Sequence, residues 1–358
     1  MKVVVVGAGI IGASVAYYLA KSGADVLLLD ANTPAFGTTS RSFAWVNANN
    51  KTPKAYFDLN AAGMQENAAL QRELGGEWLH MTGNTIVSED AAALKEKVLR
   101  LKSWGYGAGI IPPDEAREVE PGAKITDTFP NAAVAHFPGE SWSDAPLATR
   151  TITDAARLLG AEVRTGAEVV DLEAGNDGVK AGSSDGGVFV ADAVVNAAGP
   201  DGVKVARMVG RELPLDVFPG LIVRVPAPPG SLRGLLHTPT VNLRPDGEGY
   251  LAIHHETVDE KVSGEADLDA LAEELLERAF EILPALEGSG VVELRPGRRP
   301  VPGDGYSCVG GLPEIPGYYE ALTHSGVTLG PLVGKLLADE IITGDPAPLL
   351  APFRPDRF

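Results

Sequence analysis

A cluster of three arginines is the feature of this chain best suited to bind a small charged molecule. Arg295, Arg298 and Arg299 lie within five residues, and a guanidinium fork can hold a carboxylate through two parallel hydrogen bonds. The chain is otherwise acidic, with a formal net charge of −18. The cluster therefore predicts a local site for an anion, although the run Arg-Pro-Gly-Arg-Arg-Pro does not decide which arginine binds it.

Histidines are the second group with chemical potential, since they can exchange protons near neutral pH. His254 and His255 are adjacent in a predicted strand, where alternation places their side chains on opposite faces. Only one of the two can therefore face a site. Adjacent positions do not favour joint ligation of an ion, and we expect no metal.

The strongest motif is the glycine pattern that follows the apolar run Val3–Val6. Gly7, Gly9 and Gly12 form G-x-G-x-x-G, and a small-residue helix and a second apolar strand ending on Asp30 come after them. The first glycine permits a tight turn, the second lets the backbone approach a pyrophosphate, and the third lets the helix pack closely. The helix N-terminus favours phosphate, and the carboxylate can accept ribose hydroxyls. The pattern predicts a bound adenine dinucleotide.

Composition limits the classes of protein that remain. The chain has 358 residues, 44% of them hydrophobic, enough for one large or two intergrown domains. Its negative charge argues against nucleic acid as a partner. The single cysteine, Cys308, cannot form an internal disulfide. No apolar stretch is long enough to cross a membrane, and we expect a soluble, cytoplasmic protein whose oligomeric state is open.

The choice between FAD and NAD depends on later segments. A hydroxyl-rich loop, Gly37–Trp45, follows the second strand. Asp192–Pro200 is an apolar run that ends in Ala-Ala-Gly, Thr165–Val170 reads as a strand, and a glycine loop at His324–Pro331 precedes a helical pattern from Leu332 to Ile342. In these segments the chain resembles the D-amino acid oxidase, glycine oxidase and sarcosine oxidase (DAO) family. NAD alone would leave the first and last of these loops without a purpose.

The resemblance implies a noncovalent FAD cofactor and a set of residues that hold it. These are Gly7, Gly9, Ile10, Ile11, Gly12, Asp30, Ala31, Thr38, Thr39, Ser40, Arg41, Phe43, Ala44, Trp45, Val169, Ala197, Ala198, Gly199, Gly326, Val327, Thr328 and Leu329. Noncovalent binding follows because Gly297 stands where sarcosine oxidases carry the flavin-linked cysteine. Cys308 is expected to be a small core residue on a strand.

The resemblance also implies the fold. We expect an α/β protein with a Rossmann-like FAD-binding domain of the GR2/DAO type and a second, α+β substrate domain built on an antiparallel sheet. The FAD-binding domain would be discontinuous, with residues 1–77, 143–215 and 300–358. The substrate domain would take residues 78–142 and 216–299, including a helix near 268–283.

The expected catalytic residues come from the same comparison. Arg299 keeps the family spacing of an Arg-Pro ahead of an acid and glycine at Asp304-Gly305, and is the candidate anchor for a substrate carboxylate. His324 replaces an arginine that glycine oxidases carry before the last glycine loop. His255 lies where a glycine-containing strand is usual. These changes suggest a substrate other than plain glycine, such as an N-carboxymethylated amine.

The expected reaction is oxidation of the C–N bond of a small amine or amino acid. Hydride would pass from the α-carbon to flavin N5, water would hydrolyse the imine, and O2 would reoxidise the flavin. Two alternatives stay open: an FAD-dependent dehydrogenase of 2-hydroxy acids or amino acids with another electron acceptor, and a noncatalytic FAD-binding protein. The exact substrate is open as well.

Overall fold

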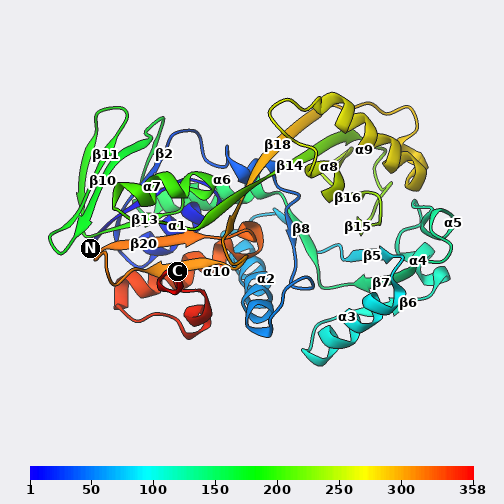
Figure 1. Ribbon diagram of the computed structural model, residues 1–358, viewed down its shortest axis with the longest axis horizontal. Helices are drawn as coiled ribbons and strands as arrows, with labels where there is room; N and C mark the ends of the chain where they lie inside the picture. Colours follow the sequence, from blue (N-terminus) through cyan, green and yellow to red (C-terminus); the bar gives the residue numbers. More distant parts are fainter.

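A six-stranded sheet forms the centre of the lobe that carries both chain termini in the computed structural model, which describes residues 1–358 (Figure 1). Its strands lie in the order β19-β20-β13-β1-β2-β9, and only β19 runs antiparallel to its neighbour. The bounds are β1 Lys2–Val6, β2 Asp25–Asp30, β9 Glu162–Thr165, β13 Ala193–Asn196, β19 Cys308–Gly311 and β20 Tyr318–Leu322. The valines of β1 are buried, as expected of a parallel strand covered on both faces.

Helices pack on this sheet and on one another. Helix α1 (Ile10–Lys21) contacts α6 (Ala145–Leu158) and α10 (Gly326–Thr343), and α10 contacts α2 (Lys54–Leu74). The lobe also contains α7 (Gly202–Met208) and the 3-10 turns η1 (Thr38–Arg41), η2 (Gly199–Asp201), η4 (Pro348–Phe353) and η5 (Pro355–Arg357).

Helix α10 begins earlier than its predicted start at Leu332, and it runs through a proline. Pro331 has no N–H, so the carbonyl of Val327 lacks its helical donor. The side chain of Asn67 on α2 donates to that carbonyl at 3.2 Å and to the Thr328 carbonyl at 2.7 Å. This tertiary contact explains how the helix continues through Pro331 and reaches back to Gly326.

The second lobe is built on an eight-stranded sheet in the order β18-β14-β17-β16-β15-β5-β7-β6. The predicted antiparallel sheet is present, with one exception, since β15 pairs with β5 in parallel. Its strands are β5 Asn84–Ser88, β6 Gly109–Ile111, β7 Ala133–Phe137, β14 Leu215–Pro226, β15 Leu235–His237, β16 Asn242–Pro245, β17 Tyr250–His254 and β18 Glu293–Pro302. Long paired strands β14 and β18 extend from this sheet toward the first lobe (Figure 1).

Helices cover parts of this second sheet. They are α3 (Ala91–Ser103), α4 (Pro113–Val119), α5 (Ile125–Thr128), α8 (Glu256–Asp259) and α9 (Leu268–Ile282), with a 3-10 turn η3 (Pro284–Leu286). Helix α9 lies where the acidic helix near 268–283 is predicted. None of the helices in the protein is long and apolar enough to cross a membrane.

Two three-stranded antiparallel sheets complete the fold. One contains β10 (Val169–Gly175), β11 (Gly178–Ser183) and β12 (Val188–Ala191), and the other contains β3 (Trp45–Val46), β4 (Leu79–His80) and β8 (Ser141–Ser143). The single strand predicted over residues 165–170 is wrong. Gly166 has a φ of +68°, a left-handed conformation that ends β9 before β10 begins.

Candidate active site

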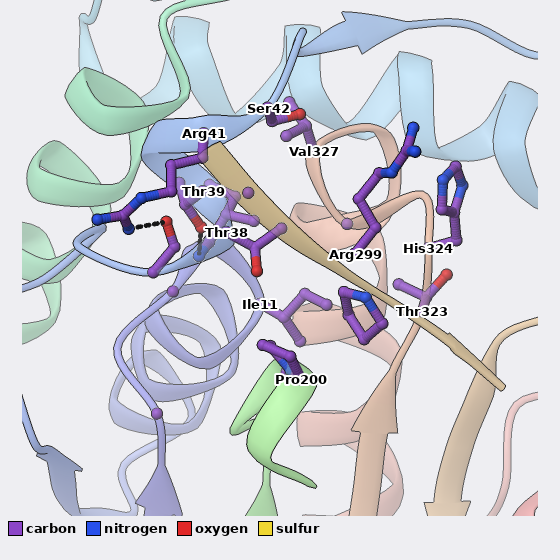
Figure 2. A pocket seen from close by; sticks show the side chains of 18 of the residues that line it. Ile11, Thr38, Thr39, Arg41, Ser42, Pro200, Arg299, Thr323, His324 and Val327 are labelled. Atoms are coloured by element: carbon purple, nitrogen blue, oxygen red, sulfur yellow. Dashed lines mark hydrogen bonds between the residues drawn. The ribbon is translucent and has the colours of Figure 1, made fainter. Parts of the chain in front are cut away.

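A cavity of about 640 Å³ lies where the two lobes meet, and its walls come from segments far apart in the sequence. This volume is within the range of ligand sites. Figure 2 shows Thr38, Thr39 and Arg41 near the N-terminus of α1, and Arg299 and His324 elsewhere on the wall. We call the part lined by the glycine loop and Asp30 the nucleotide end. The part lined by Lys51, His237, His254, Arg299 and His324 is the cationic end.

The glycines of the loop have separate structural roles. Gly7 has a φ of +102°, and a Cβ there would lie 2.5 Å from the Ala197 carbonyl oxygen. A Cβ on Gly12 would lie 1.8 Å from the Gly7 carbonyl oxygen, whereas one on Gly9 would meet only the Thr39 hydroxyl, at 3.3 Å. Gly7 and Gly12 thus permit the backbone to pack against itself. Gly9 keeps the cavity open, which is the cradle that a pyrophosphate needs.

Asp30 completes the nucleotide end. Its carboxylate accepts hydrogen bonds from the N–H groups of Ala8 and Asn32, both at 2.6 Å. Burial raises the pKa of Asp30, and the two backbone hydrogen bonds oppose that rise. The Ile10 N–H donates to Thr39 Oγ1 at 3.1 Å, which joins the hydroxyl-rich segment to the start of α1. Glycines, helix N-terminus and carboxylate together fit the phosphates and ribose of FAD.

Most residues that the sequence nominates for FAD line this cavity. Those in its wall are Gly7, Gly9, Ile10, Ile11, Asp30, Ala31, Thr38, Thr39, Arg41, Phe43, Ala44, Trp45, Val169, Ala197, Ala198, Gly199, Gly326, Val327 and Thr328. Three do not line it. Gly12 packs under Gly7, Leu329 is fully buried in the core, and Ser40 lines a separate cavity of about 430 Å³.

Only one of the three clustered arginines reaches the main cavity. Arg299 lines it, with Nη1 3.1 Å from Asp259 and Nη2 donating to the Pro219 carbonyl at 2.6 Å. Arg295 lies in the wall of the second cavity, 3.1 Å from Asp246. Arg298 is exposed and 3.4 Å from Asp201. The arginine best placed for a substrate is therefore already held by a buried carboxylate.

The histidine pair is arranged differently from the prediction. His254 lines the cavity and His255 does not. Strand β17 ends at His254, and His255 is the N-cap of α8, where its Nδ1 accepts from the Thr257 N–H at 3.3 Å. Only one of the two histidines lines the cavity, as strand alternation predicts, but it is His254, and the predicted catalytic residue His255 caps a helix.

His237 also lines the cavity, although no motif in the sequence marks it. Its Nδ1 lies 2.8 Å from Asn84 Oδ1, and Asn84 Nδ2 donates to Glu140 at 2.9 Å. Because the amide nitrogen faces Glu140, the amide oxygen accepts from the imidazole, so the proton is on Nδ1 and Nε2 is an acceptor. Burial holds the pKa of His237 well below its usual value. The neighbouring positive charge of Lys97 also lowers this pKa, so the ring is neutral.

Aromatic rings form one wall around these histidines. The ring centroids of Trp45 and His237 are 4.2 Å apart, and those of Phe43 and His254 are 4.3 Å apart. Trp45 Nε1 donates to Glu140 at 2.8 Å. The buried carboxylate therefore fixes both the indole and, through Asn84, the imidazole.

Lys51 is a second residue of the site that no sequence motif marks. Its ammonium lines the cavity and donates to Ser325 Oγ at 2.9 Å. His324 lies beside Arg299 (Figure 2), and burial together with the charges of Lys51 and Arg299 lowers the pKa of His324 to about 4. A single lysine in a polar run carries no signal in the sequence, because only its tertiary contact with Ser325, at the start of α10, brings it to the wall.

Comparison with known proteins gives the class. The model of the DAO family, described as FAD dependent oxidoreductase, matches residues 2–340. The chain belongs to this family and is an FAD-dependent oxidoreductase, so the predicted family, FAD as the cofactor, the enzyme class and the α/β fold are confirmed.

Several relatives cover nearly the whole chain. Glycine oxidase of Geobacillus kaustophilus is 28% identical over 98% of this chain and 95% of its own length. Its crystal structure superposes with a TM-score of 0.88, at 26% identity over 99% and 98% of the two chains. Iminodiacetate oxidase from Chelativorans sp. BNC1 shares the fold, with a TM-score of 0.82 at 23% identity over 99% and 98% of the chains.

Proposed function

We propose that this enzyme oxidises the C–N bond of a small amino acid or N-substituted glycine. The observation that carries the proposal is one cavity in which a dinucleotide cradle opens onto a cationic, partly aromatic end. The similarity to glycine oxidase, and the fold shared with iminodiacetate oxidase, support the same substrate class.

The chain's own residues would position the substrate. When bound, FAD supplies the two-electron acceptor. Arg299 is the proposed anchor that orients the substrate carboxylate, with its own guanidinium fixed by Asp259. His237 Nε2 would accept a hydrogen bond from the neutral substrate amine, and the lowered pKa of His324 keeps that imidazole uncharged. Phe43 and Trp45 add an apolar part of the wall beside His254 and His237.

FAD would be held by residues of the nucleotide end, including Gly9, Asp30 and Thr39, without a covalent bond. Cys308 supports this mode of binding. It is fully buried, its thiol donates to Glu320 at 3.1 Å, and it is not part of the cavity wall. We also propose O2 as the electron acceptor and a cytoplasmic location. The division into an FAD-binding domain (1–77, 143–215, 300–358) and a substrate domain (78–142, 216–299) stays a proposal.

The test is anaerobic reduction of the bound flavin, followed by its absorbance. Glycine, sarcosine, D- and L-amino acids and N-carboxymethyl amines are compared with the 2-hydroxy acids of the same side chains. Bleaching by amines but not by hydroxy acids supports the proposal. Bleaching by none of the amines contradicts it.

A 2-hydroxy acid is the second candidate, because the neutral imidazoles of His237 and His324 could accept a hydroxyl proton. Preferential bleaching by hydroxy acids in the same experiment would select it.

A further inference from the structure

The cationic end of the cavity holds one positive charge that the protein does not neutralise. Arg299 is paired with Asp259 at 3.1 Å. Lys51 has no carboxylate within 4.0 Å, and the partner of its ammonium is the hydroxyl of Ser325. A partly buried ammonium without an anionic partner is costly, because burial removes the water that would otherwise solvate it.

The acid that acts most on Lys51 is not free to pair with it. Glu140 is fully buried, and its two oxygens accept four hydrogen bonds, from Trp45, Asn49, Asn84 and Tyr106. Burial lowers the pKa of Lys51 to about 8, even though Glu140 opposes that shift. The lysine is therefore still mostly protonated near neutral pH.

The hydroxyl that Lys51 binds lies at a second source of positive potential. Ser325 is the N-cap of α10, a helix of 18 residues. The N-terminus of such a helix carries roughly half a positive charge, so a cation there is unfavourable and an anion is favourable. The lowered pKa of the adjacent His324 has Lys51 and Arg299 among its causes. Lys51 and the N-terminus of α10 thus both favour an anion at this place.

We propose that Lys51, with Ser325, binds the carboxylate of the substrate, and that Arg299 orients this carboxylate without supplying net charge. This inference rests on the proposed amine oxidation. One carboxylate balances one ammonium, because Asp259 already balances Arg299. The enzyme accordingly selects amino acids with a neutral amine over amines that lack a carboxylate.

The test measures anion binding to the FAD-loaded enzyme without turnover. Acetate and its neutral isostere acetamide are titrated near neutral pH against the absorbance of the bound flavin, in wild type, Lys51→Met, Lys51→Arg and Lys54→Met. Lys54 is a matched control, since it is exposed, three residues away, and paired with Asp58 at 2.7 Å. Thermal unfolding of each variant is recorded alongside.

Acetate should bind at least tenfold more weakly to Lys51→Met, while Lys51→Arg and Lys54→Met stay within a few-fold of wild type. Acetamide affinity should be the same in all four proteins. The melting temperature of Lys51→Met should equal or exceed that of wild type, because an unpaired charge is removed. Equal acetate affinity in Lys51→Met and wild type would overturn the inference. So would a parallel loss of acetamide binding, or no acetate binding to wild type.

Failure of the inference is distinguishable from failure of the proposed function. If acetate binding depends on Lys51 but no amine reduces the flavin, the anion site stands and amine oxidation is wrong. If amines reduce the flavin and Lys51→Met binds acetate normally, the reaction stands and the lysine has no part in binding the carboxylate.

Discussion

Alanine at two glycines of the same motif should produce two different defects. Gly9→Ala places a methyl group in the cavity, where its one close neighbour is the Thr39 hydroxyl at 3.3 Å. Gly12→Ala places a methyl group 1.8 Å from the carbonyl oxygen of Gly7. The first change should weaken FAD binding in a folded protein, and the second should destabilise the fold itself.

The distances between each added Cβ and its neighbours determine how large the two effects should be. A real Cβ essentially never lies within 3.0 Å of another atom, so Gly12→Ala must separate α1 from the glycine loop by at least about 1 Å. Overpacking of this kind costs about 1–3 kcal/mol or more, which for a chain of 358 residues corresponds to a fall in melting temperature of roughly 1–4 °C or more. Gly9→Ala at the N-cap should cost less than about 1 kcal/mol. Its FAD dissociation constant should rise at least tenfold, or about 1.4 kcal/mol.

The assay uses flavin-free protein. Thermal unfolding gives the stability of each variant, and quenching of FAD fluorescence on titration gives the dissociation constant. The reasoning is refuted if Gly9→Ala lowers the melting temperature as much as Gly12→Ala does. It is also refuted if Gly9→Ala binds FAD as tightly as wild type.

Three further predictions concern buried or site-lining groups. Asp30→Ala should weaken FAD binding at least tenfold in the same titration, since it also leaves the Ala8 and Asn32 N–H groups without acceptors; an unchanged constant would count against the ribose assignment. Glu140→Gln should change how stability depends on pH. Burial raises the pKa of Glu140 to about 7 from 4.5, so protonation favours the folded state, and this contribution, complete below pH 4.5, is lost as pH rises through 7. If the difference in stability between Glu140→Gln and wild type is the same at pH 4.5 and at pH 7, this prediction is wrong. Cys308→Ser should keep its flavin, and acid precipitation should release free FAD from both proteins; flavin retained in the wild-type pellet would show a covalent bond.

The sequence alone was sufficient to predict the nucleotide end of the cavity, because the residues that form it are close together in the chain. The strand, the glycine turn, the helix and Asp30 follow one another within 30 residues, and each is specified by a short-range property. Four valines favour a buried parallel strand, and a glycine is required wherever φ is positive or a Cβ would collide with the backbone. The resemblance to the DAO family then extended this motif to FAD and to the fold, and both are confirmed.

Which side chains line the cationic end of the cavity depends on the tertiary structure. Whether His254 or His255 faces the cavity depends on where β17 ends and α8 begins. A one-residue difference of this kind moves a side chain to the other face of a strand. The choice among the clustered arginines depends likewise on how β18 pairs with β14, which points Arg299 toward Asp259 and the cavity.

Lys51 and His237 show why such residues leave no mark in the sequence. Lys51 reaches the cavity because α10 places Ser325 beside it, 274 positions further along the chain. His237 is oriented by Asn84 and Glu140, which lie on other segments of the second lobe. Periodicity and motif spacing describe what each residue does within its own element. The charge balance and hydrogen-bond partners of a cavity depend on which distant elements meet, and only the folded chain determines that.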